Sequence, residues 1–139
     1  MTRRMGAESG QDLVEYALVL PLFLLLMFST IEFGFLFFQY TMVVNAAREG
    51  ARTGIVVDTT ACGRDCLEDR IEAAVRSKMT SVDPHKVEVT SLWPTVNYQP
   101  LVQVTVRYQT GFITGALIEE MGGNGSVTLA STATMQREY

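Results

Sequence analysis

Residues 17–38 read ALVLPLFLLLMFSTIEFGFLFF, and this stretch decides the fold because its one charged residue is Glu32. Fifteen of its 22 residues are Leu, Val, Ile or Phe. A helix of 22 residues is about 33 Å long, enough to cross a hydrocarbon core of about 30 Å. We therefore expect a membrane-spanning helix, because the apolar residues outweigh the cost of about 3 kcal/mol for one central carboxylate.

The helical pattern continues past residue 38, so we expect a single long N-terminal helix that fills segment 11–57. Beyond the apolar stretch, one face of this helix carries only small residues: Ala46, Ala47, Gly50, Ala51 and Gly54. Small residues at this spacing let another backbone approach closely. Two interpretations are open, namely packing against another subunit and packing against a sheet of the same chain, and we favour the second.

The rest of the chain, residues 58–139, has the pattern of a small α+β head. An amphipathic helix is predicted after a capping-box-like start at Asp65 and Glu68. Its apolar face comprises Leu67, Ile71, Ala74, Val75 and Met79. Apolar alternation then predicts a three-stranded antiparallel sheet from residues 86–93, 101–108 and 127–135. The apolar stretch Phe112–Ile118 fits either a short helix that completes the core or an exposed patch that touches the membrane or a partner, and we expect it in the core.

Charge and motif content argue against most other functions. The formal net charge is −4 and no run of Lys or Arg occurs, which disfavours a nucleic-acid partner. Two Cys and one His leave no tetrahedral zinc site, and the sequence holds neither a phosphate-binding loop nor a nucleophile elbow. We expect no cofactor, no metal and no enzymatic activity.

The two cysteines, Cys62 and Cys66, are separated by three residues in the sequence CGRDC. With an even number of cysteines in a chain that we expect to be exported, a disulfide that closes a small loop is the favoured interpretation. Two free thiols are the alternative.

A short polar start precedes the helix, and the junction reads GQDLVEY over residues 10–16. The junction resembles a type IV prepilin cleavage signal, and the pair Glu15-Tyr16 is similar to its Flp/Tad branch. The resemblance implies a cut after Gly10, which leaves the helix in the product and exposes a new α-amine at Gln11 that the carboxylate of Glu15 can neutralise at the membrane edge. The alternative is that Gly10 belongs to a linker and Glu15 marks the membrane interface.

The continuation from Val14 to Gly54 resembles the TadE-like family of tight-adherence pilus pseudopilins. The features that carry the resemblance are Val14-Glu15, Pro21 after an Ala-Leu-Val-Leu run, Glu32 and the block Ala46-Ala47-Arg48-Glu49-Gly50-Ala51-Arg52. The resemblance implies a structural minor pilin or pseudopilin of a type IVb pilus, with residues 1–10 as the leader. It also implies a prepilin peptidase, other Tad/Flp pilins and an inner-membrane assembly platform as partners.

The resemblance and the expected disulfide imply a bacterial inner-membrane protein with its N-terminus in the cytoplasm and its head outside. In this setting the carboxylate of Glu32, at bilayer depth, would pair with a group on a neighbouring pilin and favour assembly. A protonated Glu32 bonded to Ser29, to Tyr40 or to water within its own chain is the alternative. An unprocessed, single-pass anchored binding or sensor module is the alternative for the whole chain.

Overall fold

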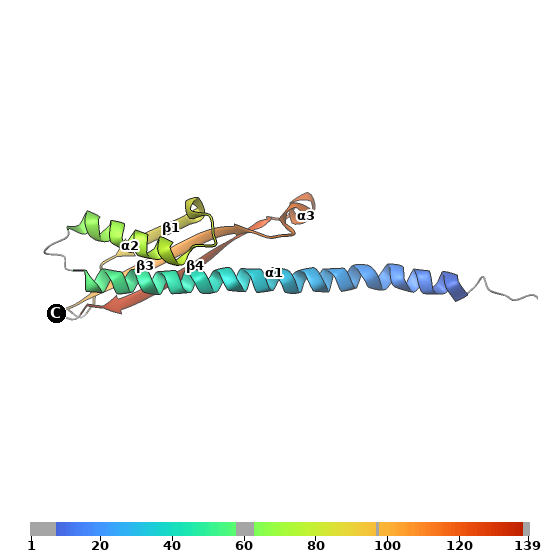
Figure 1. Ribbon diagram of the computed structural model, residues 1–139, viewed down its shortest axis with the longest axis horizontal. Coiled ribbons are helices and arrows are strands. Elements are labelled where there is room, and N and C mark those ends of the chain that lie inside the picture. The colour runs from blue at the N-terminus through green and yellow to red at the C-terminus, as the bar shows by residue number, and fades with distance from the viewer. Residues whose placement is uncertain (1–7, 58–62, 97, 138–139) are drawn as a thin grey trace, which may run out of the picture. The chain divides into compact units, whose positions relative to one another are not determined.

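The computed structural model describes residues 8–57, 63–96 and 98–137. The chain divides into two compact units, Met1–Phe35 and Leu36–Tyr139, and helix α1 (Glu8–Val56) contributes to both (Figure 1). The other elements are α2 (Arg64–Lys78), the 3-10 turn η1 (Pro84–Lys86), β1 (Val87–Leu92), β2 (Thr95–Val96), β3 (Gln99–Gly111), α3 (Gly115–Glu120) and β4 (Ser126–Gln136).

In the first unit, α1 is helical throughout its described residues and continues through Pro21. Its two hydroxyl residues in the apolar stretch are satisfied within the helix. Ser29 Oγ donates to the carbonyl oxygen of Leu25 at 2.7 Å, and Thr30 Oγ1 donates to that of Leu26 at 2.9 Å. Because these bonds need no water, neither hydroxyl opposes transfer of the helix into an apolar medium.

In the second unit, β3 is the central strand of an antiparallel sheet. Strand β1 pairs along one of its edges, with Val87 opposite Tyr108, and β4 pairs along the other, with Val102 opposite Met135. The two-residue β2 pairs with the first two residues of β3. The sheet therefore contains the three predicted strands and a fourth short one that the sequence pattern did not predict.

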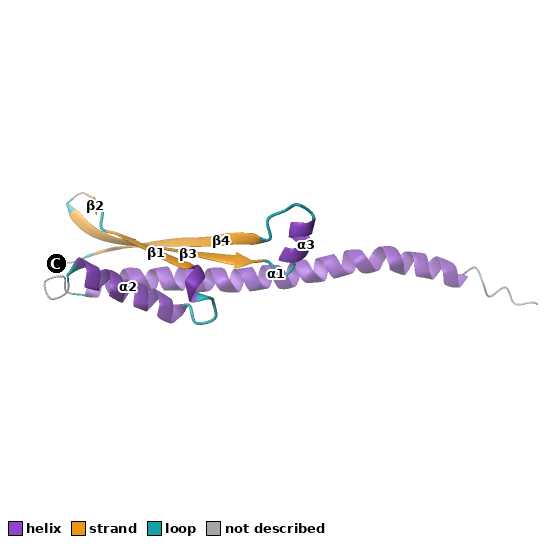
Figure 2. Cartoon of the chain, turned by 90° about the horizontal axis from the view of Figure 1, so that it is seen from above, coloured by secondary structure: helices purple, strands orange, loops and turns teal. Residues whose placement is uncertain are grey.

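The core of the second unit lies between this sheet and two helices. Alternate side chains of β3 are buried, at Val102, Val104, Val106, Tyr108 and Thr110. Leu67, Ile71 and Val75 of α2 pack into the same core. Figure 2 shows α2 beside the part of α1 that belongs to this unit, and both helices pack against the sheet, α2 on β1 and α1 on β3. Hydrophobic burial of this kind contributes about 1.5–3 kcal/mol for each large side chain. The helix packed on an antiparallel sheet confirms the predicted α+β head.

Two local expectations are wrong. The N-cap of α2 is Gly63, without a side-chain hydrogen bond, so Asp65 lies inside the first turn and forms no capping box with Glu68. There its charge favours the helix through the macrodipole instead. Phe112–Ile118 does include part of a helix, α3, but Ile113 and Leu117 are 60% and 61% exposed. This segment therefore presents apolar side chains to the surface and does not complete the core.

Two arginines tie α2 to its surroundings. The guanidinium of Arg64 stacks over the ring of Trp93 at 5.5 Å, which links the start of α2 to the residue after β1. Arg76 donates to a carboxylate oxygen of Glu72 at 2.8 Å and to the carbonyl oxygen of Pro84 at 2.7 Å. The second contact fixes the end of α2 against η1.

Candidate functional site

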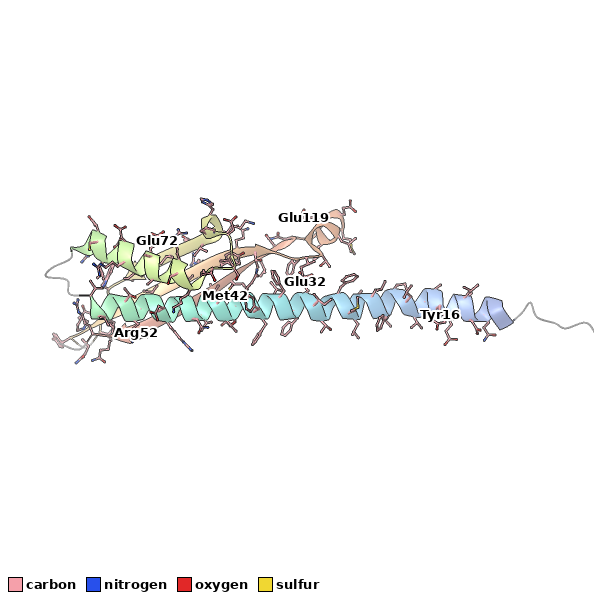
Figure 3. The ribbon with its side chains drawn as sticks, in the orientation of Figure 1. Tyr16, Glu32, Met42, Arg52, Glu72 and Glu119 are labelled. Atoms are coloured by element: carbon pink, nitrogen blue, oxygen red, sulfur yellow. The ribbon has the colours of Figure 1, made fainter. Side chains whose placement is uncertain are left out.

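The largest exposed feature of the first unit is its apolar surface. Every Leu, Val, Ile and Phe from Leu13 to Phe35 is exposed, with Leu18 at 74%. Figure 3 shows side chains projecting from both sides of α1 around the labelled Tyr16 and Glu32. Within the described residues, α1 is the one helix that is long and apolar enough to cross a membrane. This long apolar helix suggests membrane anchoring, since water would disfavour an apolar surface of this extent.

The predicted cleavage site lies in the first turns of α1. Gly10 and Gln11 are helical and exposed, and an added Cβ at Gly10 would meet nothing within 4 Å. Gln11 and Glu15 are four residues apart in the same helix, so they lie one above the other on one face. The helix thus presents the carboxylate of Glu15 on the face that a new amine at Gln11 would share. Residues 1–7 of the predicted leader lie outside the described residues.

Glu32 lies within the apolar stretch, three residues after Ser29. The single hydroxyl proton of Ser29 is used in the bond to the Leu25 carbonyl oxygen, so Ser29 does not donate to the Glu32 carboxylate in this arrangement. The internal Ser29 bond considered in the sequence analysis would therefore require a protonated Glu32 as the donor.

The small-residue face of α1 belongs to the second unit and is covered by α2 and β3 of that same unit. Ala46, Ala47 and Ala51 are fully buried. An added Cβ at Gly50 would lie 2.7 Å from Cγ2 of Val75, and one at Gly54 would lie 2.6 Å from Cγ1 of Val102. Both distances are shorter than real Cβ contacts, so α1 approaches α2 and β3 closely where it carries no side chain. This face is consequently not an open docking surface for another subunit.

The predicted disulfide includes Cys62, which lies outside the described residues, so the pairing of Cys62 with Cys66 stays a prediction. Among the residues that the structure describes, no group of three or more His, Cys, Asp or Glu side chains could hold a metal ion. His85 is exposed in η1, where its backbone N–H donates to the side chain of Asp83 at 3.0 Å.

Sequence reasoning missed two features of the second unit. The side chain of Gln39 is 4% exposed, and its Oε1 accepts no hydrogen bond from the described residues. The sequence did offer a sign of this burial, because Gln39 stands between Phe38 and Tyr40 in an apolar sequence. The second feature is the exposure of Ile113, Leu117 and Met121. The sequence analysis considered an exposed patch over Phe112–Ile118 but favoured the core, and it did not use the spacing of four residues.

Residues 10–52 match the family model of TadE-like proteins. The match covers the apolar stretch and nearly all of the small-residue face, and it confirms the resemblance drawn from the sequence. No curated protein and no solved structure matches the chain.

Proposed function

We propose that this chain, with its TadE-like match over residues 10–52, is a structural minor pilin or pseudopilin that takes part in assembling a Tad/Flp-type pilus. The observation that carries the proposal is the exposed apolar surface of α1 within the matched residues. Such a surface can be covered by lipid while the protein is in the membrane and by neighbouring helices in a filament. The chain then works by packing, without catalysis.

Processing by a prepilin peptidase after Gly10 is part of the proposal. The scissile bond lies in the first turns of α1, where helix ends fray and a peptidase can bind an extended backbone. Cleavage there leaves the apolar helix in the product and creates an amine at Gln11. The carboxylate of Glu15 lies one helical turn further along and balances the new positive charge.

Mass spectrometry of the protein from its native membrane tests the processing. We expect a mature form that begins at Gln11, and we expect Gly10→Leu to abolish it because a bulky side chain blocks the peptidase site. Gly6→Leu is the matched control, since no Glu lies five residues after Gly6, and it should leave cleavage intact. A chain that keeps its leader in cells with an active peptidase would instead support the anchored binding or sensor module.

Glu32 is proposed to act in assembly. A carboxylate in an apolar segment gains from an amine or hydroxyl on a neighbouring pilin, because the low dielectric strengthens that contact. Glu32→Leu should leave membrane insertion intact and reduce crosslinked co-purification with other pilins and with the inner-membrane assembly platform. The control Ser29→Ala removes a hydroxyl that is already bonded within the helix and should not change co-purification. Equal yields from wild type and Glu32→Leu would remove this role.

The proposed location is the bacterial inner membrane, with the N-terminus in the cytoplasm and residues 58–139 outside. A protease added to spheroplasts should then digest the exposed head and spare the apolar helix. Export would also allow Cys62 and Cys66 to form a disulfide. A thiol-alkylating reagent should therefore label the purified protein only after reduction, and labelling without reduction would contradict the pairing.

A further inference from the structure

Three large apolar side chains form an exposed stripe beside α3. Ile113, Leu117 and Met121 are 60%, 61% and 81% exposed, and they recur every fourth residue. Leu117 lies within α3 and Met121 is its C-cap, so these two side chains lie above one another on one face of the helical turn, and Ile113 directly precedes the N-cap Thr114. We call these three residues the α3 stripe.

The α3 stripe is carried by a tightly closed connection between β3 and β4. The backbone N–H of Phe112 donates to the carbonyl oxygen of Gly125 at 2.9 Å, and that of Gly123 donates to the carbonyl oxygen of Ile118 at 2.9 Å. An added Cβ at Gly115 would lie 2.9 Å from the Gly125 oxygen, so the two ends of the connection are in close contact. Because the turn is already closed, binding through the stripe requires little further ordering.

The packing of the second unit places this connection at the end where Leu36 lies. Gly54 of α1 packs on Val102, and Gly50 packs near Val104, so β3 and α1 run in opposite directions. From Val102 to Gly111 the strand advances about 30 Å, and from Gly54 back to Leu36 the helix covers about 27 Å. Strand β3 therefore ends close to the level of Leu36, and α3 follows directly.

We infer that the α3 stripe contacts the surface of the bilayer in which the apolar stretch is anchored, an inference that rests on the membrane anchoring in the proposed function. Leu36 is the residue at which the chain leaves the first unit, so the end of the second unit that carries α3 is its membrane-proximal end. A short apolar stripe at such a place buries its side chains at the boundary of headgroups and acyl chains. The stripe thus gives the head a second contact with lipid.

Charge specifies the kind of lipid. From Gly111 to Gln136 the chain has two acidic residues, Glu119 and Glu120, and no Lys or Arg. Both carboxylates are exposed beside the stripe, so anionic headgroups are repelled and zwitterionic headgroups are preferred. Figure 2 shows β2 at the opposite end of the sheet from α3. Tyr98 follows β2 by two residues and is 99% exposed, so it provides a control.

The test uses single-tryptophan variants of the full chain in phosphatidylcholine vesicles with brominated acyl chains. Trp93→Phe removes the natural tryptophan, and Leu117→Trp, Tyr98→Trp or Phe23→Trp then adds one reporter. We expect the Leu117→Trp reporter to lose most of its emission to bromine and the Tyr98→Trp reporter to lose little. We also expect quenching at Leu117→Trp to decrease as anionic lipid replaces phosphatidylcholine.

The Phe23→Trp reporter tests the membrane anchoring of α1 separately from the lipid contact of the α3 stripe. If it is quenched while the Leu117→Trp reporter behaves like Tyr98→Trp, the membrane anchor stands and the lipid contact of the α3 stripe is overturned. If the Phe23→Trp reporter is not quenched, the membrane anchoring itself fails. A third outcome would also overturn the inference. If the emission of Leu117→Trp shifts to shorter wavelength as the protein concentration rises, and bromine does not quench it, then the stripe binds a second copy of the chain.

Discussion

Gly54 and Val102 approach so closely that a Cβ atom on the glycine would lie 2.6 Å from Cγ1 of the valine. The same relationship holds between Gly50 and Val75, at 2.7 Å. Helix α1 therefore packs on β3 and on α2 at points where its own backbone forms the contact surface. The two glycines are required by this close packing, although glycine lowers the intrinsic stability of a helix.

The first prediction compares the same substitution at two glycines of α1. Gly54→Ala should lower the free energy of unfolding by about 1–3 kcal/mol, because overpacking against Val102 outweighs the gain of about 1 kcal/mol in helix propensity. Gly34→Ala should keep that gain, since an added Cβ there meets nothing within 4 Å. Denaturation in detergent micelles measures both. If both substitutions raised the free energy of unfolding, Val102 would have moved to make room for the new Cβ at position 54 without an energetic cost.

The second prediction concerns the core beneath α2. Ile71 is fully buried, so Ile71→Ala should reduce the free energy of unfolding by about 2–5 kcal/mol through lost burial and the cavity left behind. Leu92→Ala is the matched control, because Leu92 is 53% exposed at the end of β1. Its effect should be less than about 1 kcal/mol. Similar losses at the two positions would mean that Ile71 does not anchor α2 to the sheet.

Hydrophobic periodicity predicted the elements whose burial is regular. The long apolar run predicted α1, and the alternation from Val102 to Tyr108 predicted the central strand, because one side of each carries a continuous set of apolar residues. The small-residue positions Gly50 and Gly54 were also visible in the sequence. The sequence analysis favoured a sheet of the same chain as the partner of this face but kept another subunit as the alternative, since periodicity does not identify the partner of a face.

Features set by local geometry or tertiary contacts were not predictable in this way. Strand β2 has two exposed residues and no apolar pattern of its own, so only its pairing with β3 defines it. The exposure of Leu117 also depends on tertiary structure, since an apolar stripe has the same sequence in a core and on a surface. The missing cap at Asp65 reflects a helix that begins at Arg64, two residues before the start at Cys66 that a cap at Asp65 predicts.

The third prediction separates two contacts of Arg76. Arg76→Lys keeps the charge but loses the planar fork that reaches both Glu72 and the Pro84 carbonyl oxygen, and it should cost about 1 kcal/mol. Glu72→Gln removes only an exposed pair on one helix, worth about 0.3–0.5 kcal/mol. Urea denaturation should therefore rank Arg76→Lys as the more destabilising change. The reverse order would locate the stabilisation in the ion pair and not in the tether to η1.

The fourth prediction concerns the buried amide of Gln39. Its Oε1 has no hydrogen-bond partner among the described residues, and an unsatisfied buried acceptor costs about 1–3 kcal/mol. Gln39→Met removes the acceptor and keeps a flexible side chain of similar length, so it should raise the free energy of unfolding by about 1 kcal/mol or more.

Two further variants make the test of Gln39 specific. Gln39→Glu should destabilise the protein, because it buries a carboxylate in the same place. Gln109→Met, at an exposed position of β3, should change the free energy of unfolding by less than about 0.5 kcal/mol. If Gln39→Met instead lowers the stability, then Oε1 has a partner in solution, and a buried water bonded to this oxygen becomes the explanation, because removing that water's anchor would leave a cavity.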